Sequence, residues 1–253
     1  MFGLRLNFYS VSIMRSPLIL RRSDKDNNGS LINKRPPILQ DMKLYYIATT
    51  RAMRPRWLLE EMGSPYELIH VTMAMTQQPE YCQLHPHRKV PVLVDDDVTI
   101  FESAAICAYL ADKYPEKGLA PLPLTPTRGY YYQWLFYAPL TLEPPVEQFM
   151  FQVLPNLPEK LLPLKQRTHV SQQEAQEWFD KVCAPLNEVL NHQDYLVENR
   201  FSAADVVTGG VLLWALRLGM LKADNPVKVY LTKLMARPAF VKADEDFYAK
   251  IEF

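Results

Sequence analysis

The residues best placed to do chemistry lie in two short groups on either side of a predicted strand hairpin. Val90 and Pro91 open an apolar strand, and Glu102 and Ser103 stand directly before the apolar positions of a helix. A cis peptide bond before Pro91 would turn the N–H and C=O of Val90 out of the sheet, free to bind the backbone of an extended peptide. Ser103 and the free N–H groups of the helix N-terminus would bind a carboxylate, and Glu102 would bind an ammonium group. These groups suit a small zwitterionic peptide.

A simpler interpretation is a strand that begins with proline, followed by an ordinary capped helix, because each feature alone is common. The hairpin consists of the predicted strands Val90–Val94 and Val98–Phe101, joined by a turn at Asp95–Asp97. A helix follows at once and ends before Pro115. The order of elements along the rest of the chain favours the binding site over the simpler interpretation.

The elements before this hairpin form a compact unit. Lys43–Ile47 and Tyr66–Val71 are predicted strands, and Met53–Met62 is a predicted helix that Gly63 closes. Because a crossover helix joins the two strands, they should be parallel and the unit right-handed. A short helix over Pro79–Leu84 leads to the hairpin. The predicted fold class is therefore α/β for the first domain, in the order βαβ-ββα.

The remainder of the chain shows only helical periodicity. Residues 119–126 are rich in proline and predict a linker between a first domain at 42–118 and an all-helical domain at 127–253. Gly209-Gly210 inside one helix implies close helix packing, since each glycine costs about 1 kcal/mol there. The expected helices are Thr127–Tyr137 with breaks at Pro139 and Pro144-Pro145, Ser171–Leu190, Ser202–Leu216, Pro226–Met235 and Pro238–Tyr248.

Composition narrows the class of partner. The 253 residues carry 28 basic and 28 acidic side chains, which favours neither nucleic acid nor an anionic membrane surface. No apolar run is long enough to span a bilayer. Cys82, Cys107 and Cys183 are widely spaced, which favours a reducing compartment over a disulfide framework, and we expect a cytoplasmic protein.

Residues 1–41 differ from the rest and are predicted to be disordered or not part of the fold. Up to Asp24 they have no acidic residue and several arginines, as in an organellar transit peptide, but the periodicity is poor. The alternative is that Met42 is the true start and the leader is translated upstream sequence, which we favour.

With this order of elements, the chain from Met42 to Phe253 resembles the soluble, cytosolic-type glutathione S-transferases. The motifs that carry the resemblance are LYY…WLLEEMGSPYEL, KVPVL, IFESAAICAYLADKYP and FSAADV. The resemblance implies a thioredoxin-like first domain that binds glutathione and a helical second domain that supplies most of the electrophile pocket. It also implies specific contacts: a cis Pro91, Val90 paired with the cysteinyl backbone, Glu102 and Ser103 at the γ-glutamyl end, and Lys89 near the glycyl carboxylate.

One loop departs from the family pattern. Many members have Asn-Pro-x-Gly-Lys before Val-Pro, whereas this chain has His85-Pro86-His87-Arg88-Lys89 and lacks the glycine, which leaves the loop conformation open. Cys82 with His85 and His87 has the spacing of metal ligands, but a second ligand cluster is missing and we predict no metal site.

The group that activates the glutathione thiol should lie in the loop Ala48–Arg51, where family members place a tyrosine, serine or cysteine. The free thiol has a pKa near 8.5, and a hydroxyl hydrogen bond to the thiolate, worth roughly 1.5–3 kcal/mol, lowers that pKa by about one to two units. Thr50 aligns best with the serine of related classes, Thr49 is a close second, and Arg51 would add a positive field. The alternative is that the threonines only cap the following helix.

Aromatic residues cover every face of the helix Thr127–Tyr137. By resemblance this helix lines the electrophile pocket, where Tyr131, Trp134 or Tyr137 would contact an apolar substrate. Packing at the interface of a homodimer, which is expected from the resemblance, is the rival use.

The predicted function is a glutathione transferase that conjugates the glutathione thiolate to a hydrophobic electrophile. It needs no metal or organic cofactor, with glutathione as co-substrate. Two alternatives stay open: a glutathione- or protein-binding module without catalysis, and a glutathione-dependent isomerase or peroxidase.

Overall fold

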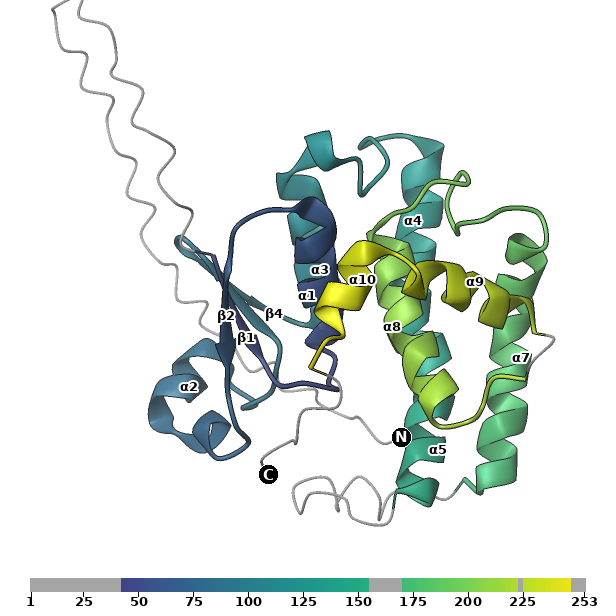
Figure 1. Ribbon diagram of the computed structural model, residues 1–253, viewed down its shortest axis with the longest axis horizontal. Helices are drawn as coiled ribbons and strands as arrows, with labels where there is room; N and C mark the ends of the chain where they lie inside the picture. The colour runs from purple at the N-terminus through teal and green to yellow at the C-terminus, as the bar shows by residue number, and fades with distance from the viewer. Residues whose placement is uncertain (1–41, 155–169, 223–224, 247–253) are drawn as a thin grey trace, which may run out of the picture. The chain divides into compact units, whose positions relative to one another are not determined.

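A computed structural model describes residues 42–154, 170–222 and 225–246 (Figure 1). The predicted leader at 1–41 and parts of the predicted helical domain lie outside the described residues. Within the described ranges, no helix has both the length and the apolar character needed to cross a membrane.

Four short strands form one mixed sheet in the order β2-β1-β3-β4. They are β1 (Lys43–Tyr46), β2 (Glu67–His70), β3 (Val92–Asp95) and β4 (Val98–Phe101). Strand β1 runs parallel to β2, with Leu44 opposite Leu68, and antiparallel to β3, with Leu44 opposite Leu93; β3 and β4 are antiparallel. Helix α1 (Met53–Met62) connects the parallel pair. The predicted βαβ-ββα order is confirmed.

The two other predicted helices of this domain are present as α2 (Pro79–Leu84) and α3 (Ser103–Lys113). Two short 3-10 turns, η1 (Met75–Gln77) and η2 (Pro115–Lys117), were not predicted. Gly63 ends α1 in the left-handed conformation with φ 61°, as expected for a glycine cap.

Asp95 differs from its prediction as part of a solvated turn. It is the last residue of β3 and is buried, and only Asp96 and Asp97 are exposed. Its Oδ2 accepts a hydrogen bond of 2.8 Å from the hydroxyl of Tyr109 and binds the ammonium group of Lys113, both on α3. A buried carboxylate needs such partners, so Asp95 holds the hairpin against α3.

The second domain is helical throughout its described residues. Its elements are α4 (Pro126–Tyr137), the π-helical turn η3 (Ala138–Leu142), α5 (Glu143–Val153), α7 (Gln172–Leu190), α8 (Ala203–Arg217), α9 (Pro226–Met235) and α10 (Pro238–Ala243). The chain changes helix type at both expected breaks: α4 ends before Pro139, which lies in the first turn of η3, and Pro144-Pro145 lie in the first turn of α5, where proline is tolerated. Helix α10 is shorter than the predicted helix.

Two capping boxes begin the long helices. The hydroxyl of Ser171 accepts from the N–H of Glu174 at 3.2 Å, and the carboxylate of Glu174 accepts from the N–H of Ser171 at 2.8 Å. At the start of α8, Asp205 accepts from the N–H of Ser202 at 2.8 Å and from the hydroxyl of buried Tyr230 at 2.8 Å. The predicted Ser202–Asp205 cap is confirmed.

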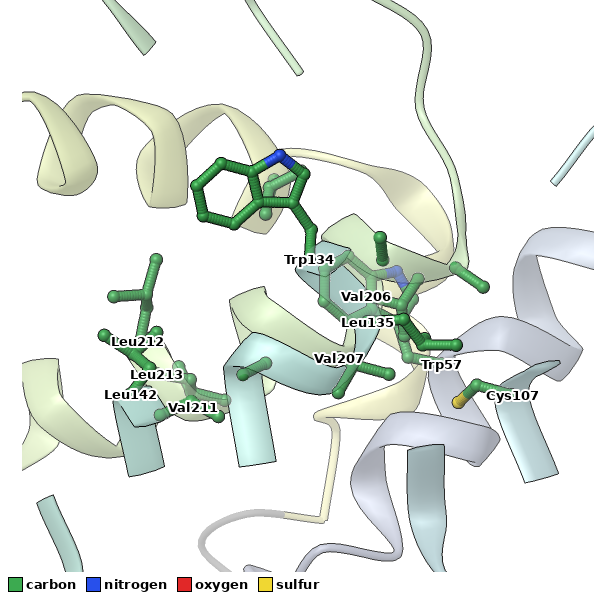
Figure 2. Packing of buried hydrophobic residues seen from close by; sticks show 14 of the residues in the cluster. Trp57, Cys107, Trp134, Leu135, Leu142, Val206, Val207, Val211, Leu212 and Leu213 are labelled. Atoms are coloured by element: carbon green, nitrogen blue, oxygen red, sulfur yellow. The ribbon is translucent and has the colours of Figure 1, made fainter. Parts of the chain in front are cut away.

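One hydrophobic core joins the two domains around α8. Trp57 and Cys107 of the first domain belong to the same buried cluster as Leu135, Val206 and Val207 of the second (Figure 2). A Cβ atom on Gly209 would lie 3.0 Å from Cζ3 of Trp57, so α1 and α8 pack as closely as the two glycines predicted.

Candidate active site

The peptide bond between Val90 and Pro91 is cis, as the resemblance implies. Val90 lies outside the sheet ladder, and neither its N–H nor its C=O has a partner within the described chain. The carbonyl of the preceding Lys89 is fixed, since it accepts a 2.8 Å hydrogen bond from the hydroxyl of buried Tyr81. The structure thus presents one residue, Val90, with an unpaired N–H and C=O just before the start of β3.

The loop before this bond lacks the glycine of the family pattern, and another residue adopts the backbone conformation that glycine favours. Arg88 occupies the glycine position of the family pattern and has φ 55°, in the left-handed region that glycine favours. The N–H of His87 donates to Nδ1 of His85 at 3.1 Å, and the ring of His85 packs 4.5 Å from Phe101. Burial lowers the pKa of His85, which keeps its ring neutral and able to accept this bond. The contacts of His85 therefore help to hold the loop in a conformation that a glycine would adopt without strain.

The start of α3 places the second predicted group. Glu102 is exposed, has φ 72° and no side-chain partner among residues 42–154, 170–222 and 225–246. A non-glycine residue at such a φ carries strain of order 1–3 kcal/mol, which is typical of binding sites. Ser103 follows at the first position of the helix and is 5% exposed. Its Oγ accepts a hydrogen bond of 3.3 Å from Nη1 of Arg54.

The thiol loop Ala48–Arg51 uses its two threonines differently. The hydroxyl of Thr50 donates to the carbonyl of Ile47 at 2.7 Å and accepts from the N–H of Ala52 at 3.2 Å. This is the local turn that threonine often forms before a helix, and it occupies the hydroxyl proton. Thr49 has φ 63°, an outlier for a β-branched residue, and its hydroxyl has no partner in the described part of the chain.

Arg51 is paired with carboxylates of the helical domain. Its Nε binds Oε1 of Glu143 and its Nη2 donates to Oε1 of Glu147 at 3.0 Å, while the guanidinium lies 5.2 Å from the ring centre of Trp214. Burial alone would lower the pKa of Arg51, but Glu143 and Glu147 raise it. The positive field expected from Arg51 is therefore largely balanced by these two carboxylates.

Arg54 is a site residue that the sequence reading missed. It is 1% exposed, and its Nη2 donates to Oε2 of Glu143 at 2.6 Å while Nη1 reaches Ser103. Burial raises the pKa of Glu143, but Arg54 and Arg51 lower it more, so this carboxylate is ionised. The available signal was the position of Arg54 on the apolar face of α1, three residues before Trp57 and facing Gly210 of α8.

Comparison with known proteins agrees with this geometry. Residues 40–112 match the family model for the glutathione S-transferase N-terminal domain, and residues 147–238 match the model for the C-terminal domain. Glutathione S-transferase 3 of Zea mays is 31% identical over 210 residues, covering 79% of this chain and 92% of that protein. The chain belongs to the glutathione S-transferase family.

Two solved structures share the fold of this transferase. A glutathione transferase of Methylococcus capsulatus superposes with a TM-score of 0.66 and 26% identity, covering 83% of this chain and 100% of that one. A sphingomonad glutathione S-transferase complexed with glutathione gives a TM-score of 0.66 at 24% identity, covering 82% and 100% of the two chains. The protein is thus a glutathione S-transferase-like enzyme with a thioredoxin-like first domain and a helical second domain.

The predicted electrophile residues pack mostly inside the helical domain. Tyr131 is 0% exposed and Trp134 is buried in the core, and the hydroxyl of Tyr137 donates to the carbonyl of Val182 on α7 at 2.9 Å. Rings packed in this way offer little surface to a substrate. The exposed aromatic residues of α4 are Tyr130, Tyr132 and Phe136, so the use of this helix at a homodimer interface stays a prediction.

On the helical-domain side of the thiol loop, the transferase instead places Glu143 and Glu147 of α5 and Trp214 of α8. A cavity of about 280 Å³ lies elsewhere, between the end of α7 and α9, and no predicted site residue lines it. Within the described ranges, no three His, Cys, Asp or Glu side chains are grouped closely enough to hold a metal ion.

Proposed function

We propose that this transferase binds glutathione along the edge formed by Val90 and the start of α3 and conjugates its thiolate to a hydrophobic electrophile. The electrophile accepts a bond from sulfur to carbon. In a substitution the leaving group departs with the bonding electrons, and in an addition the neighbouring atom takes a proton.

The unpaired backbone N–H and C=O of Val90 are the observation that carries the proposal. A backbone N–H and C=O facing out of a cis peptide corner can pair with the cysteinyl backbone of glutathione as one more strand would. Lys89 directly precedes Val90, and Glu102 and Ser103 follow Phe101, which pairs with Val92. Their charges and hydroxyl suit the two ends of the tripeptide. Lys89 is exposed, and the Glu102 side chain makes no hydrogen bond or ion pair in residues 42–154, 170–222 and 225–246, so both are available to a ligand.

We assign thiolate stabilisation to Thr49, with Thr50 second. The hydroxyl of Thr50 already donates to Ile47, and a single hydroxyl has one proton to give. The hydroxyl of Thr49 has no partner in the described part of the chain, and its backbone lies in the left-handed region with φ 63°. A hydrogen bond from Thr49 to sulfur, worth about 1.5–3 kcal/mol, would make thiolate the main form near neutral pH.

The position of Trp214 is consistent with a hydrophobic electrophile as the second substrate. Its ring is half-buried beside Arg51, and it reaches the thiol loop from the helical domain. An electrophile next to the sulfur would meet this aromatic surface together with the paired charges of Arg51 and Glu147. Tyr131, Trp134 and Tyr137 would then support the site from the core instead of contacting the substrate.

The test is a binding measurement followed by a turnover measurement on the purified full chain. Calorimetry should show glutathione binding, and a panel of apolar halides, epoxides and α,β-unsaturated carbonyls should include at least one compound that is conjugated. Thr49→Ala should lower kcat for that compound about 10- to 100-fold while changing the glutathione Kd less than threefold, because the lost hydrogen bond goes to the thiolate.

Thr49→Ser is the matched control, since it keeps the hydroxyl and should retain most of the turnover. Absence of glutathione binding would overturn the proposal as a whole. Binding without conjugation of any compound in the panel would overturn the transferase reaction and leave a binding protein.

A further inference from the structure

One buried carboxylate, Glu143, is linked to both ends of the candidate site through two arginines. Oε1 of Glu143 binds Arg51, the last residue of the thiol loop. Oε2 of Glu143 accepts a hydrogen bond of 2.6 Å from Arg54. Arg54 in turn contacts Ser103 at the start of α3. Glu143 and Arg54 are both almost completely buried. Because Glu143 begins α5, a residue of the helical domain is joined to both ends of a site that otherwise lies in the thioredoxin-like domain.

The contact from Arg54 fixes what the hydroxyl of Ser103 can do. A guanidinium has only donors, so Nη1 of Arg54 must donate to Oγ of Ser103 at 3.3 Å. The hydroxyl hydrogen of Ser103 then points away from Arg54 and is left to donate to another group. Donation from a charged group also polarises the O–H bond and strengthens the next hydrogen bond in the chain.

We propose that Arg54 is a positioning residue that aims the hydroxyl of Ser103 at the γ-glutamyl carboxylate, and that Glu143 holds Arg54 in place for this task. The proposal rests on the proposed function, in which Ser103 binds that carboxylate. Arg54 itself need not touch glutathione.

Helix α8 has a glycine, Gly210, where the side chain of Arg54 packs against it. A Cβ atom on Gly210 would lie 2.6 Å from Cγ and 2.9 Å from Nε of Arg54, so any larger residue would displace the guanidinium. The neighbouring Gly209 faces Trp57 and Leu234 instead, with a Cβ contact of 2.9 Å to Leu234. The two glycines therefore offer a matched pair: both substitutions crowd the interface of α1 and α8, and only one moves Arg54.

The experiment compares Gly210→Ala with Gly209→Ala in the full chain. Calorimetry measures the Kd for glutathione and for an analogue in which the γ-glutamyl α-carboxylate is a neutral amide. We expect Gly210→Ala to weaken glutathione binding about tenfold, or about 1.4 kcal/mol, and to reduce the preference for glutathione over the amide by a similar factor. Gly209→Ala should keep the wild-type preference and lose less than threefold in glutathione affinity.

Equal losses in the two glycine variants would overturn the proposal, because a general packing defect would then explain both. If the amide binds the wild type too weakly for its Kd to be measured, the test rests on the glutathione Kd alone. Gly210→Ala must then raise that Kd more than Gly209→Ala does.

Glu143→Gln and Glu147→Gln provide a second pair that does not depend on packing. Both remove a carboxylate from Arg51, but only Glu143 also holds Arg54. Glu143→Gln should reduce the preference for glutathione over the amide at least threefold, and Glu147→Gln should leave that preference unchanged. The opposite order would contradict the proposal.

These experiments distinguish a failure of the Arg54 proposal from a failure of the proposed function. Wild-type protein that does not bind glutathione refutes the proposed function. Wild-type binding with unchanged preference in Gly210→Ala and Glu143→Gln refutes only the role of Arg54.

Discussion

The two parts of the proposed glutathione site are built in different ways. The part at the hairpin is set mainly by backbone: a cis peptide bond at Val90–Pro91, a positive φ at Glu102 and the start of α3 at Ser103. The sulfur end is set by side-chain hydrogen bonds, in which Thr50 closes a local turn and Arg51 is paired with Glu143 and Glu147. The first kind of end can be recognised from residue types and order, whereas the second depends on which partner each hydroxyl and guanidinium finds.

Glu143 is the residue that links the two parts of the site, and we expect its removal to cause the largest loss of unfolding free energy. Glu143→Ala leaves Arg54 buried without its partner, which typically costs 3–5 kcal/mol. Urea unfolding followed by circular dichroism measures the loss of unfolding free energy. Glu147→Ala is the control, because Glu147 and Arg51 are 30% and 40% exposed and such pairs contribute about 0–1 kcal/mol. Similar losses in both variants would show that the two ends do not depend on one carboxylate.

The same carboxylate should give the protein a pH dependence with a defined sign. Arg54 and Arg51 lower the pKa of Glu143 below its ordinary value of 4.5, despite burial. Its contribution to stability is therefore full above about pH 4.5 and is lost as the pH falls through the lower folded-state pKa. The difference in unfolding free energy between wild type and Glu143→Gln, measured by urea titration from pH 6 downward, should shrink in acid. A difference that grows in acid would contradict the pairing.

Arg88 allows a smaller test at the backbone-built end. Arg88→Gly should be more stable than Arg88→Ala by about 0.5–1 kcal/mol, because glycine avoids the left-handed penalty of about 1–2 kcal/mol while the unfolded chain gains about 0.4–1 kcal/mol of entropy. Both variants lose the guanidinium contacts to Cys82 and Gln77. Thermal or urea unfolding measures the difference, and a more stable alanine variant would mean that φ 55° at Arg88 carries no strain.

Much of the fold could be predicted from the sequence because local patterns and chain order agree. The bounds of α1 and α2 coincide with the predicted helices, and the cap at Ser202 and the close contact at Gly209-Gly210 are present. Asp95 was misplaced because a run of three aspartates reads as a turn, and only the approach of Tyr109 and Lys113 from α3 shows that its carboxylate is buried.

The site could be predicted only in part for a related reason. The cis bond at Pro91 and the start of α3 at Ser103 are present as expected, although β3 begins at Val92 and not at Val90. Arg54 and Glu143 are 89 residues apart in sequence and meet only after the two domains pack, so no local pattern announces them. Spacing alone does not tell which aromatic rings of α4 face the core and which face solvent.

The central claim, that the free hydroxyl of Thr49 stabilises the thiolate, is tested most directly by the pKa of glutathione bound to the protein. Difference absorbance of the thiolate near 240 nm, titrated from pH 5 to 9, gives this pKa for the wild type, Thr49→Ala and Thr50→Ala. The account predicts a bound thiol pKa about one to two units below the free value in the wild type and in Thr50→Ala, and a return toward the free value in Thr49→Ala. A pKa that rises in Thr50→Ala and stays low in Thr49→Ala would contradict it.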